Sequence, residues 1–132
     1  MSPSIEILII GNEILSGRTI DRNSHYMVAE LGKAGFPVKF ISVAGDDLED
    51  LARMFHTASG RAEIILATGG LGPTSDDITL EAAARAFGRE MRLNEGVLAN
   101  ITEIFRRRNR FMSDSNRRQA LIPEGGIPIE NS

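Results

Sequence analysis

Apolar residues gather in three short runs that are separated by polar or helix-like segments. The first run, Ile5–Ile10, is almost continuously β-branched and ends at Gly11, a pattern typical of a strand buried on both faces of a sheet. Val38–Val43 and Ile64–Ala67 have the same strand-like composition. The sequence therefore predicts three strands.

Between and after these runs, apolar residues recur at helical spacing. This periodicity predicts four helices and a shorter fifth one: Met27–Ala34, Leu48–Ala58, Asp77–Phe87, Val97–Phe105 and a segment capped by Ser113 or Asp114. Strands that alternate with helices of these lengths form parallel βαβ units with right-handed crossovers. We therefore expect an α/β fold in which helices cover both faces of a mostly parallel sheet. The last residues, 127–132, resemble the entry to another strand.

Composition narrows the class of protein. The chain has 132 residues, of which 42% are hydrophobic and 25% charged, an ordinary balance for one globular domain. A net charge of −3 argues against general affinity for nucleic acid or anionic membranes. The absence of cysteine excludes disulfides, thiol nucleophiles and cysteine–zinc sites, and the N-terminus carries no signal-like segment. The sequence predicts a cytoplasmic protein without nucleic-acid or membrane partners.

Ligands of open α/β sheets bind beyond the carboxyl ends of the strands. Three loops follow predicted strands here, Gly11–Gly17, Gly45–Asp47 and Thr68–Asp77. In the third, Gly69, Gly70 and Gly72 permit close approach of the backbone, and the following helix directs its free N–H groups toward the loop. This arrangement suits phosphate or another anion.

The carboxylates of Asp76 and Asp77 would repel such an anion unless a cation lay between them. Mg²⁺ held by one or two carboxylates and by ligand phosphates would remove that conflict. The simpler interpretation is that the glycines form a turn and that one aspartate caps the helix. Similarly, Asp46 or Asp47 could cap the helix at Leu48, and Glu13 could be a solvated loop residue.

Other polar residues have simpler interpretations. His25 and His56 lie in predicted helices without the spacing of a metal site, so we expect surface or half-buried positions. The basic segment 106–110 lies at a predicted helix C-terminus, where cations complement the helix dipole, although a phosphate or an acidic partner is the alternative.

At the three loops the sequence resembles the MoaB/Mog molybdopterin-binding domain, and most closely the N-terminal domain of the competence/damage-inducible protein A (CinA) family. The resemblance rests on Gly11–Gly17, Asn23, Gly45-Asp46, Thr68–Thr74, Asp76–Thr79 and Asn116–Pro123, and spans nearly the whole chain. The element Gly-Gly-Leu-Gly-Pro-Thr-x-Asp-Asp is its most specific part.

The resemblance implies a three-layer α/β/α sandwich, with residues 1–132 as a single domain that forms homo-oligomers. It also implies an enzyme acting on a phosphoanhydride with a divalent cation: either an ADP-ribose pyrophosphatase or a molybdopterin adenylyltransferase. Carried over by motif, Asp77 and Asp46 are the expected catalytic and metal-binding residues. The expected ligand-binding residues are Gly11, Glu13, Ser16, Asn23, Thr68, Gly69, Gly70, Gly72, Pro73, Thr74 and Asp76.

Two departures from the family pattern keep other functions open. Asn12 stands where an acidic residue is usual, and an amide supplies no charge to a cation. The chain also stops at Ser132, ahead of the family's final glycine-rich loop and closing strand, so we expect a chain that lacks the C-terminal part. A binding module for a pterin or nucleotide, or an oligomerisation module, are the alternatives to an enzyme.

Overall fold

Three parallel strands form the centre of the protein. The computed structural model describes residues 2–130. β1 (Ile5–Ile10) lies between β2 (Val38–Ala44) and β3 (Ile64–Thr68), with parallel pairing on both sides. All six residues of β1 are buried, which confirms the prediction of a strand covered on both faces.

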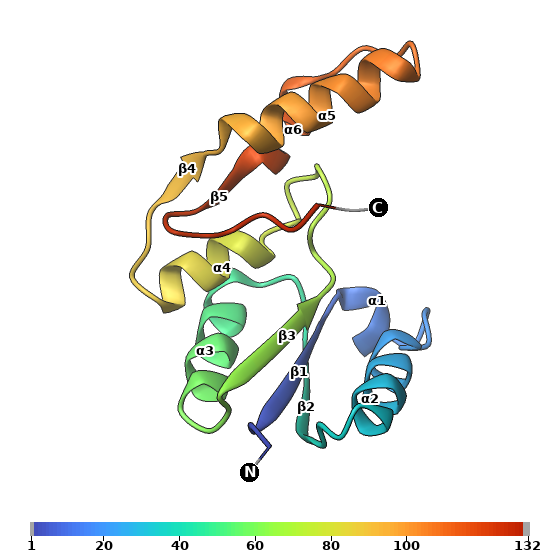
Figure 1. Ribbon diagram of the computed structural model, residues 1–132, viewed down its shortest axis with the longest axis vertical. Coiled ribbons are helices and arrows are strands. Elements are labelled where there is room, and N and C mark those ends of the chain that lie inside the picture. Colours follow the sequence, from blue (N-terminus) through green and yellow to red (C-terminus); the bar gives the residue numbers. More distant parts are fainter. Residues whose placement is uncertain (1, 131–132) are drawn as a thin grey trace.

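Helices cover this sheet on two sides (Figure 1), so the expected α/β/α layering is confirmed. α2 (Asn23–Lys33) lies on one face, and α3 (Leu48–Ser59) and α4 (Thr79–Ala86) lie on the other. The segment after β1, expected to be a loop, forms a single helical turn, α1 (Asn12–Leu15).

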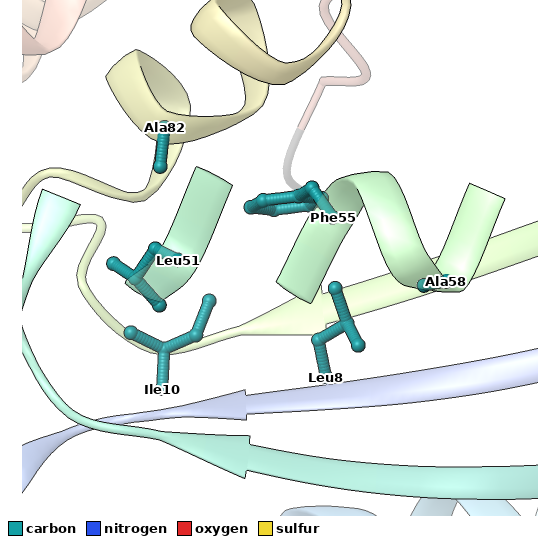
Figure 2. Close-up of a cluster of buried hydrophobic side chains, with 6 residues drawn as sticks. All are labelled: Leu8, Ile10, Leu51, Phe55, Ala58 and Ala82. Carbon is teal, nitrogen blue, oxygen red and sulfur yellow. The ribbon is translucent and has the colours of Figure 1, made fainter. Parts of the chain in front are cut away.

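The main core lies between β1, α3 and α4 (Figure 2). Leu8 and Ile10 point from β1 toward Leu51 and Phe55 of α3, and Ala82 of α4 closes the cluster. Because side chains alternate along a strand, Ile7 and Ile9 face the opposite side, where α2 packs. The core thus fixes the ends of β1 and β3, from which the segments 11–17 and 68–77 emerge.

A second part of the chain packs beyond α4 (Figure 1). It consists of a two-stranded antiparallel sheet with adjoining helices: β4 (Met91–Leu93), α5 (Glu95–Arg107), α6 (Asp114–Arg117), the 3₁₀ helix η1 (Arg118–Ala120) and β5 (Leu121–Pro123). The two strands were not predicted, because three residues are too few to display a periodic pattern. The segment 124–130 forms no strand, and residues 131 and 132 of the predicted strand entry lie outside the described residues.

Two predicted caps are confirmed. The Asp47 carboxylate accepts a hydrogen bond from the Asp50 N–H at 2.9 Å and caps α3. Ser113 caps α6 and forms a capping box with Asn116. His25 and His56 are exposed, in agreement with the surface interpretation. Within residues 2–130, no helix is long and apolar enough to cross a membrane.

Candidate functional site

Two glycines shape the loop that follows β3. Gly69 and Gly70 have φ values of +98° and +62°, a region that favours glycine. A Cβ atom on Gly69 would lie 2.0 Å from the carbonyl oxygen of Ile10, so this backbone packs directly against the end of β1. The loop can follow this path only because both positions lack a side chain.

Thr79, the first residue of α4, holds this loop in place. Its hydroxyl donates to the Gly69 carbonyl oxygen at 2.7 Å, and its N–H donates to the Gly70 carbonyl oxygen at 3.2 Å. The Thr79 residue is 2% exposed, so water does not compete for these bonds. These two bonds therefore join the start of α4 to the glycine turn.

We expect Thr79→Val to lower the free energy of unfolding by about 1–2 kcal/mol, because the half-buried Gly69 would lose the hydroxyl donor to its carbonyl oxygen. Chemical denaturation of the variant beside the native protein measures this loss. Thr79→Ser keeps the hydroxyl and is the matched control. Native-like stability of Thr79→Val, which keeps a methyl group and lacks only the hydroxyl, would show that this hydrogen bond does not stabilise the fold.

Asp77 turns its carboxylate back toward the loop. Its Oδ2 accepts hydrogen bonds from the Thr74 hydroxyl at 2.6 Å and from the Thr74 N–H at 2.9 Å. These bonds, with one from the Gly72 backbone, lower the pKa of Asp77 against the opposing effect of desolvation. Asp77 is therefore an ionised group at neutral pH.

The expectation that Asp76 or Asp77 caps the helix is wrong. α4 begins at Thr79, its N-cap position is Ile78, and no side chain bonds to the free N–H groups there. Asp77 does not cap because its carboxylate already accepts two bonds from Thr74 within the loop.

A cavity of about 290 Å³ opens beside this loop. Five predicted residues line it: Gly70, Gly72, Pro73, Thr74 and Asp77. The other lining residues have no predicted site role: Leu71, Leu80, Glu81, Met91, Arg118, Gln119 and Leu121. Most of these lie on α4 or in the second part of the chain. For Arg118, Gln119 and Leu121 the only signal in the sequence was the family-like segment Asn116–Pro123. We call this space the loop cavity.

A second cavity, of about 220 Å³, lies at the ends of β1 and β3. Glu13, Asn23, Thr68 and Gly69 are among its lining residues. The Asn23 side-chain amide donates to the Thr68 hydroxyl at 3.3 Å, which ties the start of α2 to the end of β3. Nine of the thirteen predicted site residues are thus divided between these two cavities.

Asp46 is engaged elsewhere. Its N–H donates to the side-chain oxygen of Asn12 at 3.0 Å, and its carboxylate accepts the Asn12 N–H at 3.2 Å. The asparagine at position 12 therefore forms a reciprocal link between the loops after β1 and β2. The predicted residues that line neither of these two cavities are Gly11, Ser16, Asp46 and Asp76.

The loop cavity brings together charged, polar and apolar side chains. Thr74 contributes a hydroxyl, Asp77 and Glu81 contribute carboxylates, and Arg118 contributes a guanidinium. Leu80, Met91 and Leu121 supply apolar surface. Across residues 2–130, no group of three or more histidine, aspartate or glutamate side chains is arranged to hold a metal ion. A cation here would need oxygen ligands from the bound molecule as well.

Comparison with known proteins places these features in a family. Residues 6–128 match the family described as "Probable molybdopterin binding domain". The chain is similar to a CinA-like protein of Gloeothece citriformis, with 43% identity over 97% of the chain, and to one of Gloeobacter violaceus, with 44% identity over 99%. It spans 31% of the length of each of these relatives.

Solved structures show the same fold. The crystal structure of CinA from Thermoplasma acidophilum, described as a protein of unknown function, superposes with a TM-score of 0.89 and 32% identity. The alignment covers 98% of this chain and 76% of that one. MoaB from Pyrococcus furiosus, described as a tungsten cofactor synthesizing protein, superposes with a TM-score of 0.57 and 24% identity, covering 78% of this chain and 64% of that one. At that identity the likeness shows the fold.

Proposed function

Since the chain belongs to the family of probable molybdopterin-binding domains, in its CinA-like branch, we propose that it binds a phosphate-bearing nucleotide or pterin. The ligand would lie in the loop cavity, where the protein would cleave a phosphoanhydride bond. An ADP-ribose-type substrate is the first choice. Hydrolysis would consume one water: its oxygen bonds to phosphorus, the anhydride P–O bond breaks, and the leaving phosphate keeps the electron pair. AMP, ribose 5-phosphate and two protons are the products, with both phosphate groups as dianions.

The observation that carries this proposal is the position of Asp77. An ionised carboxylate, held by Thr74, lines a cavity beside a glycine turn that lets a ligand approach the backbone. Its lowered pKa makes Asp77 a poor proton donor or acceptor at neutral pH. The same property suits a carboxylate that binds a cation, so we assign Asp77 a charge-stabilising role rather than acid–base catalysis.

The donor set of the loop cavity fits a hard divalent cation such as Mg²⁺. Thr74 bonds to Oδ2 of the Asp77 carboxylate and not to Oδ1, so a cation would bind through Oδ1. Mg²⁺ in nucleotide sites characteristically takes one or two carboxylates, together with substrate phosphates and water. A bound cation of this kind would neutralise the negative charge that develops on the phosphoryl oxygens. Asp77 and the Thr74 hydroxyl are the residues that would hold and orient it.

A molybdopterin adenylyltransferase is the second candidate. The similarity in fold to MoaB and the apolar surface of Leu80, Met91 and Leu121 favour it, because a flat pterin ring also needs an apolar wall. This reaction likewise exchanges a phosphoanhydride bond, so the same charged groups would serve it.

A ligand panel tests the proposal. The melting temperature is measured with Mg²⁺ and ADP-ribose, ATP, AMP or a pterin phosphate, and each mixture, together with one of ATP and the pterin phosphate, is then chromatographed for products. Stabilisation with formation of AMP and ribose 5-phosphate supports the pyrophosphatase. An adenylylated pterin formed from ATP supports the transferase. Stabilisation without product would leave a binding module, and a protein that responds to none of these ligands would contradict the proposal.

A further inference from the structure

The loop cavity contains an imbalance of charge around the proposed anion. Asp77 and Glu81 both bring carboxylates to its wall, and a phosphate group is repelled by each. One cation bound at Asp77 would offset part of this repulsion. Among the described lining residues, Arg118 is the single basic side chain.

Arg118 is available to a ligand. Its guanidinium forms no salt bridge with a described residue, whereas Arg61, Arg85, Arg92 and others are paired with carboxylates. A planar guanidinium carries five N–H donors in a fork that matches two phosphate oxygens. An arginine with that capacity unused, at the wall of a cavity, has the chemistry of an anion receptor.

The backbone that carries Arg118 is firmly anchored on the side of the cavity. Ala120, two residues on, is fully buried, and its carbonyl oxygen accepts the Asn94 N–H at 2.8 Å. The Gln119 side-chain amide donates to the Leu71 carbonyl oxygen at 3.3 Å and so joins η1 to the glycine-rich loop. The second part of the chain therefore contributes Arg118 to the wall of the loop cavity.

The remaining wall of the cavity is apolar. Leu80, Met91 and Leu121 are half-buried and come from α4, β4 and β5. Such side chains favour the face of a planar heterocycle over a free phosphate ion. A cavity with one guanidinium and one apolar wall is suited to a molecule that joins a flat ring to a phosphate.

We infer that Arg118 binds the phosphate of the ligand, and that the heterocyclic ring of the ligand lies against Leu80, Met91 and Leu121. This assignment rests on the proposed function, because it concerns the same cavity. It adds that the second part of the chain supplies the phosphate receptor and so completes the site that the loop after β3 begins. Adenine nucleotides and pterin phosphates share the required chemistry.

Titration calorimetry of four ligands tests the inference: AMP and adenosine, and a pterin phosphate and the same pterin without phosphate. Native protein is compared with Arg118→Gln and Arg118→Lys. Arg117→Gln is the matched control, because Arg117 is an exposed neighbouring arginine that does not line the cavity. We expect Arg118→Gln to weaken binding of the phosphorylated ligand about 10- to 100-fold, the usual effect of losing charge-assisted hydrogen bonds. Binding of the ligand without phosphate should stay within about twofold. The affinity of Arg118→Lys for the phosphorylated ligand should lie between those of native protein and Arg118→Gln. Lysine keeps the positive charge but lacks the paired N–H donors of the planar guanidinium.

Each other outcome has a definite meaning. Unchanged affinity for AMP and pterin phosphate in Arg118→Gln would overturn the assignment of Arg118 and leave the proposed function standing. An equal loss for ligands with and without phosphate would also overturn it, since it would show a structural role. If native protein bound none of the four ligands, this inference would fail, whereas the proposed function would be decided by the panel with ADP-ribose and ATP. If AMP and adenosine bind more tightly than the two pterin ligands, the ring is adenine; if the two pterin ligands bind more tightly, the ring is a pterin.

Discussion

Replacing Asp77 with asparagine is expected to lower turnover of ADP-ribose about 10²- to 10³-fold, the usual effect of removing one preorganised charge-stabilising group. Asparagine still offers an oxygen that can accept the two bonds from Thr74, at 2.6 Å and 2.9 Å in the native protein. The variant therefore removes the negative charge and preserves the turn. Initial rates of AMP formation with Mg²⁺, at saturating substrate, measure the effect.

Asp114→Asn is the matched control for this experiment. Asp114 is an exposed carboxylate in the first turn of α6 and does not line the loop cavity. Its rate should equal that of the native protein, and both variants should melt within a few degrees of it. Native-like turnover by the Asp77→Asn protein would remove Asp77 from the mechanism, whatever the ligand panel had shown.

Replacing Arg61 with alanine is expected to lower the free energy of unfolding, because it leaves the buried carboxylate of Glu6 without its cation. Glu6 lies on the central strand with a side chain that is 0% exposed. Arg61 donates to both of its carboxylate oxygens, at 2.8 Å and 2.7 Å, and the Ser42 hydroxyl donates at 2.6 Å. The guanidinium also lies 4.0 Å from the centre of the Phe40 ring.

The pH dependence of this loss follows from the pKa of Glu6. The hydrogen bonds from Arg61 are the main cause that lowers this pKa, against desolvation, which raises it. A lowered pKa in the folded state contributes stability that is present above the unfolded pKa of about 4.3. That contribution is lost as pH falls through the folded value, because the protonated carboxyl no longer gains from the pair.

Urea denaturation of native protein and Arg61→Ala between pH 3 and pH 7 measures both effects. The difference in unfolding free energy should be largest near neutral pH and should shrink on acidification. The double variant Glu6→Gln/Arg61→Ala removes the buried charge as well and should recover part of the stability at neutral pH. A difference that is the same at every pH would mean that Arg61 acts through packing on Phe40 and not through its charge.

The secondary structure was largely predictable, because its signals are local. The run Ile5–Ile10 predicted a buried strand, and the apolar spacing around Leu51 and Phe55 predicted α3, which packs on it. Capping residues marked helix starts at Asp47 and Ser113. Each of these signals depends on neighbours within a few positions, so the sequence alone could reveal them.

The position of the glycine-rich loop was also predictable, and its internal bonding was not. Parallel strands bring their carboxyl ends to one edge of the sheet, which placed the loop beyond β3. The aspartates were expected to serve α4, but Asp77 bonds to Thr74 and Thr79 holds the turn. Several acceptors compete for the same few donors in such a loop, and only the folded path of the chain decides among them.

By itself, the sequence determined the α/β class, the family and the loop beside which the cavity lies, because these are written in local patterns and in a short specific motif. Only the tertiary structure decided the composition of the cavity. It separated Glu13 and Asn23 from Asp77, linked Asp46 to Asn12, and brought Arg118 and Gln119 across a separation of about 48 residues to the glycine-rich loop. It also paired Glu6 with Arg61, 55 residues away. Contacts at such separations arise from packing of whole elements against one another, and no local pattern in the chain encodes which side chains will then meet.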